Sequence, residues 1–147
     1  MEIEVKKFNE LTIYELHDLL QLRSEVFVVE QDCVYQDIDG KDENALHVFG
    51  KKDGNMVAYT RIFAPGFYFP QAAIGRVVVP ADQRKFGYGH VIMEASIQAI
   101  KNEYQKKEIK LSAQEHLRKF YESHGFTQIG EGYLEDGIPH VAMIKYS

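Results

Sequence analysis

Tryptophan is absent from this 147-residue sequence, cysteine occurs once, and no long apolar run is present. No stretch approaches the ~18 apolar residues that span a bilayer, so we expect no membrane insertion. Residues 1–7 lack the basic-then-apolar plan of a signal peptide. The single Cys33 excludes an internal disulfide framework and a cysteine-rich zinc site, and we expect no metal ion. These features indicate a cytoplasmic protein whose core is anchored by nine tyrosines and nine phenylalanines.

Positive charge is also scarce, because 17 lysines and arginines face 22 acidic residues, which gives a formal net charge of −5. Non-specific nucleic-acid binding depends on a basic surface, so this balance argues against nucleic acid as a partner. The 45% hydrophobic and 27% charged fractions are typical of a folded globular chain. No repeat, low-complexity tract or linker divides the sequence, and we expect one domain over residues 1–147.

Hydrophobic periodicity predicts a chain of strands and helices. The expected strands cover residues 2–7, 46–51, 56–63, 73–79, 109–113, 126–130 and 138–146, and the expected helices cover 11–29, 88–104 and 115–123. Asp53-Gly54 between two strand-like runs favours a hairpin. The strands at 73–79 and 109–113 flank a helix, and such a unit forms a parallel pair with a right-handed crossover. The fold class is therefore α/β, with a mixed sheet and helices on its faces.

The segment Arg84-Lys85-Phe86-Gly87-Tyr88-Gly89, called the glycine loop below, lies between a valine-rich strand and the long helix. The first turn of a helix exposes unpaired backbone N–H groups, and glycines let the backbone approach an anion closely. Two basic side chains add positive charge, so the loop suits a diphosphate. Gly-Lys-Ser/Thr is absent, which excludes a nucleotide P-loop, and Ile92 replaces the third glycine of a dinucleotide fingerprint. From the residues alone, a tight strand-to-helix turn remains the alternative.

Several motifs, in order along nearly the whole chain, resemble those of the GNAT superfamily of N-acetyltransferases. Arg-x-x-Gly-x-Gly at 84–89 is similar to its cofactor motif, and Leu-Ser-Ala-Gln at 111–114 with Phe-Tyr-Glu-Ser-His-Gly-Phe at 120–126 to its later motif. Glu-Val-Phe-Val-Val-Glu-Gln at 25–31, Gln-Asp-Ile-Asp-Gly at 36–40 and Gly-Ile-Pro-His at 137–140 resemble the ElaA-like branch. The resemblance implies a central mixed sheet that splays open between the strands at 73–79 and 109–113.

The resemblance also implies acetyl-coenzyme A as the cofactor. Its pantetheine arm would bond to the backbone of Val77, Val78 and Val79, and its pyrophosphate would lie on the backbone N–H groups of Arg84, Lys85, Phe86, Gly87, Tyr88 and Gly89. Tyr121 matches the superfamily tyrosine that faces the cofactor sulfur. A phenol with a reference pKa of ~10 is protonated at neutral pH and can donate to a thiolate. A tyrosine that merely packs between helix and sheet is the alternative.

The activity that the resemblance implies is acetyl transfer to a primary amine, by direct attack in a ternary complex. Candidates for the general base are His116, His140 and Glu30, acting directly or through water. A backbone N–H near Val78 is the expected oxyanion donor, following the superfamily. The alternative function is a non-catalytic module that binds acyl-coenzyme A and regulates a partner.

Acidic residues concentrate between positions 25 and 43, where Lys41 is the only basic residue. In the superfamily this region borders the acceptor site, and an acidic rim attracts a protonated amine. We therefore expect Glu30 and Asp37 to bind the substrate, with a solvated acidic loop as the alternative. Arg76 lies in an otherwise apolar strand and needs a partner, either an acidic substrate group or a carboxylate of the protein. The acceptor's identity is left open, and the apolar closing strands could support a homodimer.

Overall fold

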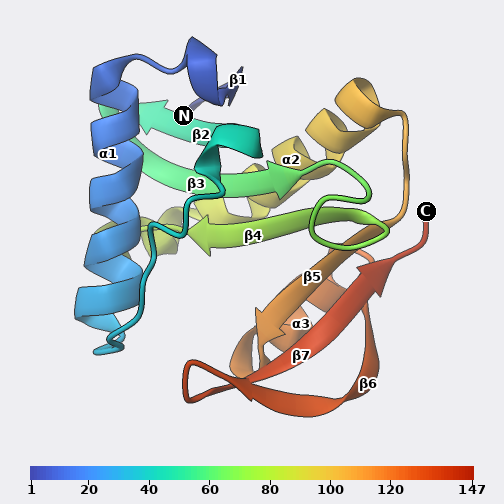
Figure 1. Cartoon of the computed structure of the whole chain (residues 1–147). Helices are drawn as coiled ribbons and strands as arrows, with labels where there is room; N and C mark the ends of the chain where they lie inside the picture. Colours follow the sequence, from blue (N-terminus) through green and yellow to red (C-terminus); the bar gives the residue numbers. More distant parts are fainter.

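A seven-stranded mixed sheet runs through the molecule, as Figure 1 shows for the computed structural model, which describes residues 1–147. The strands lie side by side in the order β1-β2-β3-β4-β5-β7-β6. Their bounds are β1 (Glu2–Lys7), β2 (Leu46–Lys52), β3 (Asn55–Phe63), β4 (Ala72–Val78), β5 (Ile109–Gln114), β6 (Thr127–Glu135) and β7 (Ile138–Lys145). Neighbouring strands are antiparallel except β4 and β5, which are parallel. The predicted mixed sheet and its parallel pair are confirmed.

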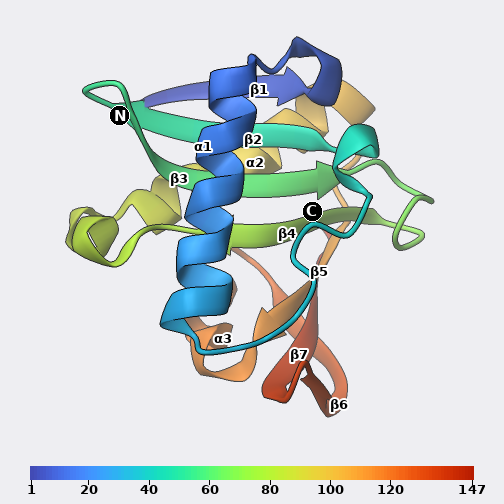
Figure 2. The ribbon, with the colours of Figure 1, turned by 60° about the vertical axis from the view of Figure 1, so that its left-hand side comes forward.

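Helices cover both faces of strands β1 to β4 (Figure 2). On one face lies α1 (Ile13–Arg23), which continues directly into a π-helical segment, η2 (Ser24–Glu30), so the predicted helix over 11–29 is confirmed. On the other face lies α2 (Tyr88–Tyr104), and α3 (Arg118–Glu122) follows a 3-10 turn, η5 (Glu115–Leu117). No helix of the structure combines the length and the apolar character needed to cross a membrane.

The core is divided between the two faces of the sheet. Ile92 and Ile100 of α2 pack with strand side chains on one face, and Leu19 of α1 packs with Phe49 and Tyr59 on the other. All five side chains are fully buried. Burial on both faces explains why the central strands read as apolar runs with little alternation.

Two hairpins close with two-residue turns. Asp53 and Gly54 join β2 to β3 at φ 53° and 80°, and Asp136 and Gly137 join β6 to β7 at φ 52° and 77°. Positive φ at both central positions is type I′ geometry, whose twist matches that of the flanking strands. The hairpin expected at Asp53-Gly54 is confirmed.

Strand β6 is longer than the sequence predicts. The expected strand ends at Gly130, whereas β6 continues to Glu135. Gly130 adopts φ 70° inside a bulge, and pairing with β7 resumes at Tyr133. A glycine in a strand pattern can mark a bulge as well as the end of the strand. Here Gly130 marks a bulge, and the strand continues beyond it. The extension places Tyr133 and Glu135 beside His140 of β7.

The sheet opens between β4 and β5. These strands pair only at Ala72 and Ala73, the first two residues of β4, and then diverge (Figure 1). Strand β5 instead keeps a continuous antiparallel ladder with β7 over its full length. Beyond Ala73, the edge of β4 that faces β5 therefore has no strand partner.

A bulge in β4 accompanies this opening. Tyr59 of β3 pairs with Val78 and Arg61 pairs with Gly75, so three residue steps on β4 match two on β3. The extra residue lies at Arg76, which adopts φ 50°. Left-handed backbone is uncommon outside glycine and bends a strand locally. The bulge thus lies in the part of β4 that no longer pairs with β5.

Candidate functional site

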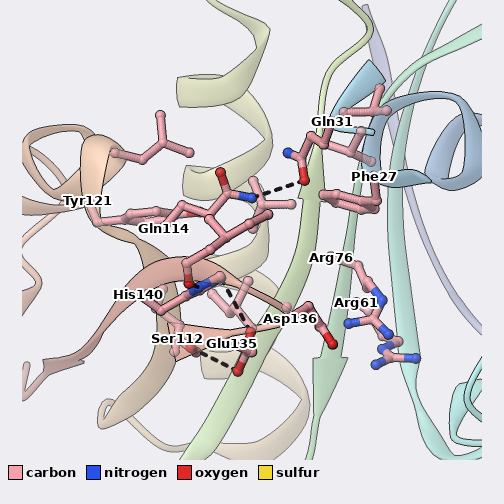
Figure 3. A pocket seen from close by; sticks show the side chains of 18 of the residues that line it. Phe27, Gln31, Arg61, Arg76, Ser112, Gln114, Tyr121, Glu135, Asp136 and His140 are labelled. Atoms are coloured by element: carbon pink, nitrogen blue, oxygen red, sulfur yellow. Dashed lines mark hydrogen bonds and ion pairs between the residues drawn. The ribbon is translucent and has the colours of Figure 1, made fainter. Parts of the chain in front are cut away.

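A cavity of about 520 Å³ lies in the opening between β4 and β5. Its walls come from η2, β4, the glycine loop, β5, α3 and the β6–β7 hairpin (Figure 3). The lining residues used below are Glu30, Gln31, Arg76, Val77, Val78, Val79, Arg84, Gly89, Ser112, Gln114, His116, Tyr121, Glu135, Asp136 and His140. The predicted site residues from β4, α3 and β7 are thereby brought together in one place.

The β4 wall offers backbone groups. Val77, Val78 and Val79 all line the cavity. The side chain of Val78 is buried against α1, so this residue presents its backbone to the opening. Unpaired N–H and C=O groups on a strand edge can bond to an extended ligand as a neighbouring strand would. This wall therefore suits a linear, amide-containing arm.

The glycine loop bounds the cavity beside the start of α2. Gly87, at φ 73°, ends a short 3-10 helix, η4 (Ala81–Phe86), and α2 begins at Tyr88. The N–H groups of Tyr88 and Gly89, in the first turn of α2, have no intrahelical acceptor. A Cβ on Gly89 would lie 3.4 Å from the ring of Phe120, so a larger side chain would crowd this end of the cavity. This geometry fits an anion held by backbone groups.

Of the two basic side chains of the glycine loop, Arg84 is paired with a carboxylate of the protein and Lys85 is not. Arg84 donates through Nη1 and Nη2 to the two carboxylate oxygens of Glu30, at 2.7 and 2.9 Å, and through Nε to the Val79 carbonyl at 3.0 Å. This pair ties η2 to the loop and engages both carboxylate oxygens of Glu30 at the cavity wall. Lys85 and Phe86 are exposed and lie outside the cavity wall, and Lys85 forms no ion pair.

Tyr121 of α3 points into the cavity (Figure 3). Its ring packs edge-on against Phe120 and Phe126, with centroids 5.0 and 6.2 Å apart, and only 5% of the residue is exposed. The hydroxyl forms no hydrogen bond within the protein, and burial raises the pKa of the phenol well above its usual range. The phenol therefore stays protonated at neutral pH, with its proton available to a group in the cavity.

His140 of β7 is held in one orientation. Its Nδ1 lies 2.7 Å from the carbonyl oxygen of Ile138, and because a carbonyl only accepts, Nδ1 carries the proton. Its Nε2 lies 3.3 Å from Oε2 of Glu135. In the neutral ring, Nε2 is thus a proton acceptor beside a carboxylate that would stabilise the imidazolium.

Ser112 and Tyr133 hold Glu135 beside this histidine. The hydroxyls of Ser112 and Tyr133 are hydrogen-bonded to each other, and Ser112 Oγ donates to Glu135 Oε1 at 3.3 Å. The ring of Tyr133 stacks on that of His140 with centroids 6.3 Å apart. These residues come from β5, β6 and β7, and the register of the three strands places them together.

The second predicted histidine is less constrained. His116 is exposed in η5, at the rim of the cavity, and no hydrogen bond fixes its ring. Nearby, Gln114 Nε2 of β5 donates to Oε1 of Gln31 at 3.3 Å, which connects the two sides of the opening (Figure 3). Of the two histidines, His140 is the one whose position the protein defines.

The aspartate-rich segment after η2 is held by buried arginines. Arg23, 0% exposed, donates to Asp37 at 2.9 Å and to Asp42 at 2.8 Å, and Arg61 donates to Asp39 and Asp42 at 2.9 Å. Although burial opposes ionisation, the hydrogen bonds from both arginines hold the pKa of Asp42 below its usual range. These aspartates form a buried ion-pair network, which is neither a steering rim nor a solvated loop.

Asp37, one of the expected substrate-binding residues, lies in this network and is not among the residues that line the cavity. Its Oδ2 accepts from Arg23, and its Oδ1 accepts from the Tyr35 hydroxyl at 2.8 Å. Arg76 Nε also lies 2.8 Å from Oδ1, as an ion pair without hydrogen-bond geometry. Both oxygens are thus engaged within the protein. Arg76 has the carboxylate partner that the sequence left open, and it lines the cavity as well.

Ser112, Gln114, Glu135 and Asp136 were not among the predicted site residues. They lie on β5 and on the β6–β7 hairpin, which meet through the pairing of β5 with β7. One signal was available in β5, whose sequence alternates apolar and polar residues from Ile109 to Gln114. Ser112 and Gln114 share a face because strand side chains have a period of two.

Comparison with known proteins agrees with the geometry. Residues 10–147 match the acetyltransferase (GNAT) domain family. ElaA of Escherichia coli strain K12 is 42% identical over 139 residues, which are 93% of this chain and 91% of ElaA. The crystal structure of E. coli ElaA has a TM-score of 0.90 at 39% identity, and that of an acyl-CoA N-acyltransferase from Pseudomonas aeruginosa 0.93 at 42%, each over 99% of both chains.

The fold extends to distant proteins. An aminoglycoside 6′-N-acetyltransferase complexed with coenzyme A has a TM-score of 0.72 at 15% identity, over 99% of this chain and 96% of that one. The resemblance found in the motifs, including that to the ElaA-like branch, is confirmed. A matching domain over residues 10–147 and close relatives along the whole fold lead to one conclusion: this chain belongs to the GNAT family of acetyltransferases.

Proposed function

We propose that the protein transfers the acetyl group of acetyl-coenzyme A to a primary amine, by direct attack in a ternary complex. The observation that carries the proposal is the unpaired edge of β4, which borders the same cavity as Tyr121 and His140. A strip of free backbone and two groups suited to proton transfer thus share one opening. The related fold that is complexed with coenzyme A supports coenzyme A as the ligand of this opening.

The residues present fit coenzyme A. The backbone of Val77, Val78 and Val79 would hold the pantetheine arm along the open edge of β4. The N–H groups at the start of α2, in the glycine loop, would hold the pyrophosphate, with the exposed Lys85 adding positive charge. Gly89 leaves space that a side chain would fill. Once bound, acetyl-coenzyme A supplies the acetyl group as a thioester.

Proton transfer falls to two side chains of the cavity. Tyr121 donates a proton to the departing sulfur, because burial keeps its phenol protonated. His140 accepts the proton of the attacking amine at Nε2, because Nδ1 is already committed to the Ile138 carbonyl. Glu135 stabilises the resulting imidazolium from 3.3 Å. A backbone N–H near Val78 is the donor that would stabilise the developing oxyanion.

His140 is better placed for the general-base role than the other two candidates. Both carboxylate oxygens of Glu30 accept hydrogen bonds from Arg84, so neither is free to take a proton from the amine. His116 is exposed, and no contact within the protein orients its ring. The general-base role is therefore assigned to His140 in this proposal.

The experiment measures release of free coenzyme A thiol from acetyl-coenzyme A with a panel of primary amines, with mass spectrometry of the acetylated product. His140→Asn should lower kcat/KM by about 10²-fold, the lower end for general acid–base catalysis. His17→Asn, at an exposed histidine of α1 outside the cavity, is the matched control and should leave the rate unchanged. Binding of acetyl-coenzyme A without acetylation of any amine would contradict the proposal and favour the regulatory module.

A further inference from the structure

Arg76 presents a fixed guanidinium to the cavity with one nitrogen free. Its Cζ lies 5.5 Å from the centre of the Tyr35 ring, Nε pairs with Asp37, and Nη2 lies 3.1 Å from the Asp37 carbonyl and 3.4 Å from Asp39 Oδ2. Nη1 forms no hydrogen bond within the protein, and the side chain is 22% exposed. A guanidinium held on one edge in this way is oriented to bind a carboxylate on the other.

Two carboxylates lie on the cavity wall opposite Arg76, and neither pairs with it. Figure 3 shows Asp136, at the tip of the β6–β7 hairpin, directed toward the side on which Arg61 and Arg76 lie. No ion pair joins Asp136 to either arginine, although Arg61 and Arg76 both pair with Asp39. Glu135 lies beside Asp136 and next to His140. The cavity thus has a donor of positive charge on one wall and two carboxylates on the other.

Aromatic side chains line the same part of the cavity. Tyr35, Phe63, Tyr68 and Phe69 are all in its wall. Phe63 and Tyr68 are stacked at 5.6 Å, and Tyr68 meets Phe69 edge-on at 5.0 Å. Such a surface binds an apolar group by burial and aromatic contact. It adds a third feature, an apolar surface, to the two charged ones.

We propose that the acceptor is an α-amino acid with an apolar or aromatic side chain. This inference rests on the proposed acetyltransferase function and specifies its substrate class. Arg76 Nη1 binds the α-carboxylate, Glu135 and Asp136 attract the α-ammonium, and the aromatic wall receives the side chain. A compact zwitterion is the kind of molecule that satisfies charges of opposite sign across one cavity.

The chemistry balances with the groups already named. The ammonium first loses one proton to water, and the neutral nitrogen then forms a bond to the acetyl carbon as the carbon–sulfur bond breaks. The second proton of the amine passes to Nε2 of His140, and the sulfur leaves with the proton of Tyr121. His140 then gives its proton to solvent and the Tyr121 phenolate takes one back, which restores both groups. The products are the N-acetyl amino acid and the free thiol of coenzyme A.

The test compares acceptors that differ only in the carboxylate: phenylalanine with 2-phenylethylamine, and leucine with 3-methylbutylamine. Thiol release gives kcat/KM for each at one pH, in the native sequence and in Arg76→Gln. The variant should lose at least about tenfold with the amino acids and no more than about threefold with the plain amines, because one charge-assisted hydrogen bond is removed. Comparing the two proteins cancels the intrinsic reactivity of each amine.

Controls separate this inference from folding and from the proposed function. Arg118→Gln changes an arginine of α3 outside the cavity and should keep the native preference. Thermal unfolding with acetyl-coenzyme A shows that each variant still folds and binds the cofactor. If Arg76→Gln does not fold, Arg76→Lys keeps the charge near Asp37 but lacks the guanidinium, and it should lose the same preference.

The outcomes are distinct. Preference for the amino acids that disappears in the Arg76 variants supports the inference. Plain amines acetylated as fast as the amino acids, or an equal loss with both in Arg76→Gln, would overturn it and leave the proposed function standing. No thiol release with any acceptor would overturn both.

Discussion

Replacing Tyr121 by phenylalanine removes one oxygen atom from the cavity and little else. The hydroxyl forms no hydrogen bond within the protein, and the contacts of the ring with Phe120 and Phe126 are those of a phenylalanine as well. No buried partner is left unsatisfied by the change. The free energy of unfolding should therefore change by less than about 1 kcal/mol. For a chain of this length, that is a shift of less than roughly 3 °C in the unfolding midpoint.

The effect on turnover should be far larger. If Tyr121 donates its proton to the departing sulfur, Tyr121→Phe removes a general acid, and such groups contribute about 10²–10⁴-fold. We expect kcat to fall by about 10²-fold or more. The dissociation constant of acetyl-coenzyme A should change by less than about twofold, because the ring that lines the cavity remains.

The assay is steady-state thiol release with acetyl-coenzyme A and an accepted amine, with cofactor affinity measured on the same protein. Tyr104→Phe, at the end of α2 and outside the cavity, is the matched control and should behave as the native protein. A Tyr121→Phe protein that folds normally and keeps more than about half of its kcat would refute the general-acid role.

Three further outcomes concern the folded state. Arg23→Ala should cost about 3–5 kcal/mol in denaturant unfolding, because it removes a fully buried cation that Asp37 and Asp42 share and leaves each of them with one arginine partner fewer; an unchanged midpoint would contradict this. Burial opposes ionisation of Glu15, yet hydrogen bonds from the Thr12 N–H, Lys6 and Lys51 lower its pKa from 4.5 to about 2. The unfolded chain therefore binds this proton more tightly, so the stability that Glu15 adds is full above pH 4.5 and lost as the pH falls toward 2. Glu15→Gln should flatten the acid limb of the unfolding free energy, and an unaltered limb would exclude this origin.

Local sequence patterns were sufficient to predict most of the strands and helices. The helical spacing of apolar residues predicted α2 with both ends as observed, because its amphipathic face and the glycine before it are local signals. The parallel pairing of β4 with β5 followed from the crossover rule. The end of β6 could not be predicted from local patterns. Gly130 could equally terminate a strand or occupy a bulge, and only pairing with β7 distinguishes the two.

The candidate site was predictable where one segment carries the chemistry. The glycine loop and the valines of β4 are contiguous in sequence, and Tyr121 lies within a motif. The ion pairs of Asp37 were not predicted, because its partners Arg23 and Arg76 are 14 and 39 residues away and composition alone cannot show that they pair. Glu135 was missed for the same reason, because only the three-strand register brings it to His140.

Binding of acetyl-coenzyme A in the opening between β4 and β5 is tested most directly by thermal unfolding with and without that ligand. ATP and NAD at equal concentration serve as controls. At ~100 times its dissociation constant, a ligand of the folded state adds ~2.7 kcal/mol, or roughly 9 °C in the midpoint for a chain of this length. We predict such a shift with acetyl-coenzyme A alone, and a smaller one in Gly89→Val, whose side chain would crowd the helix end beside Phe120. No shift at saturating acetyl-coenzyme A would contradict the cofactor site, and the glycine loop would then be only a turn.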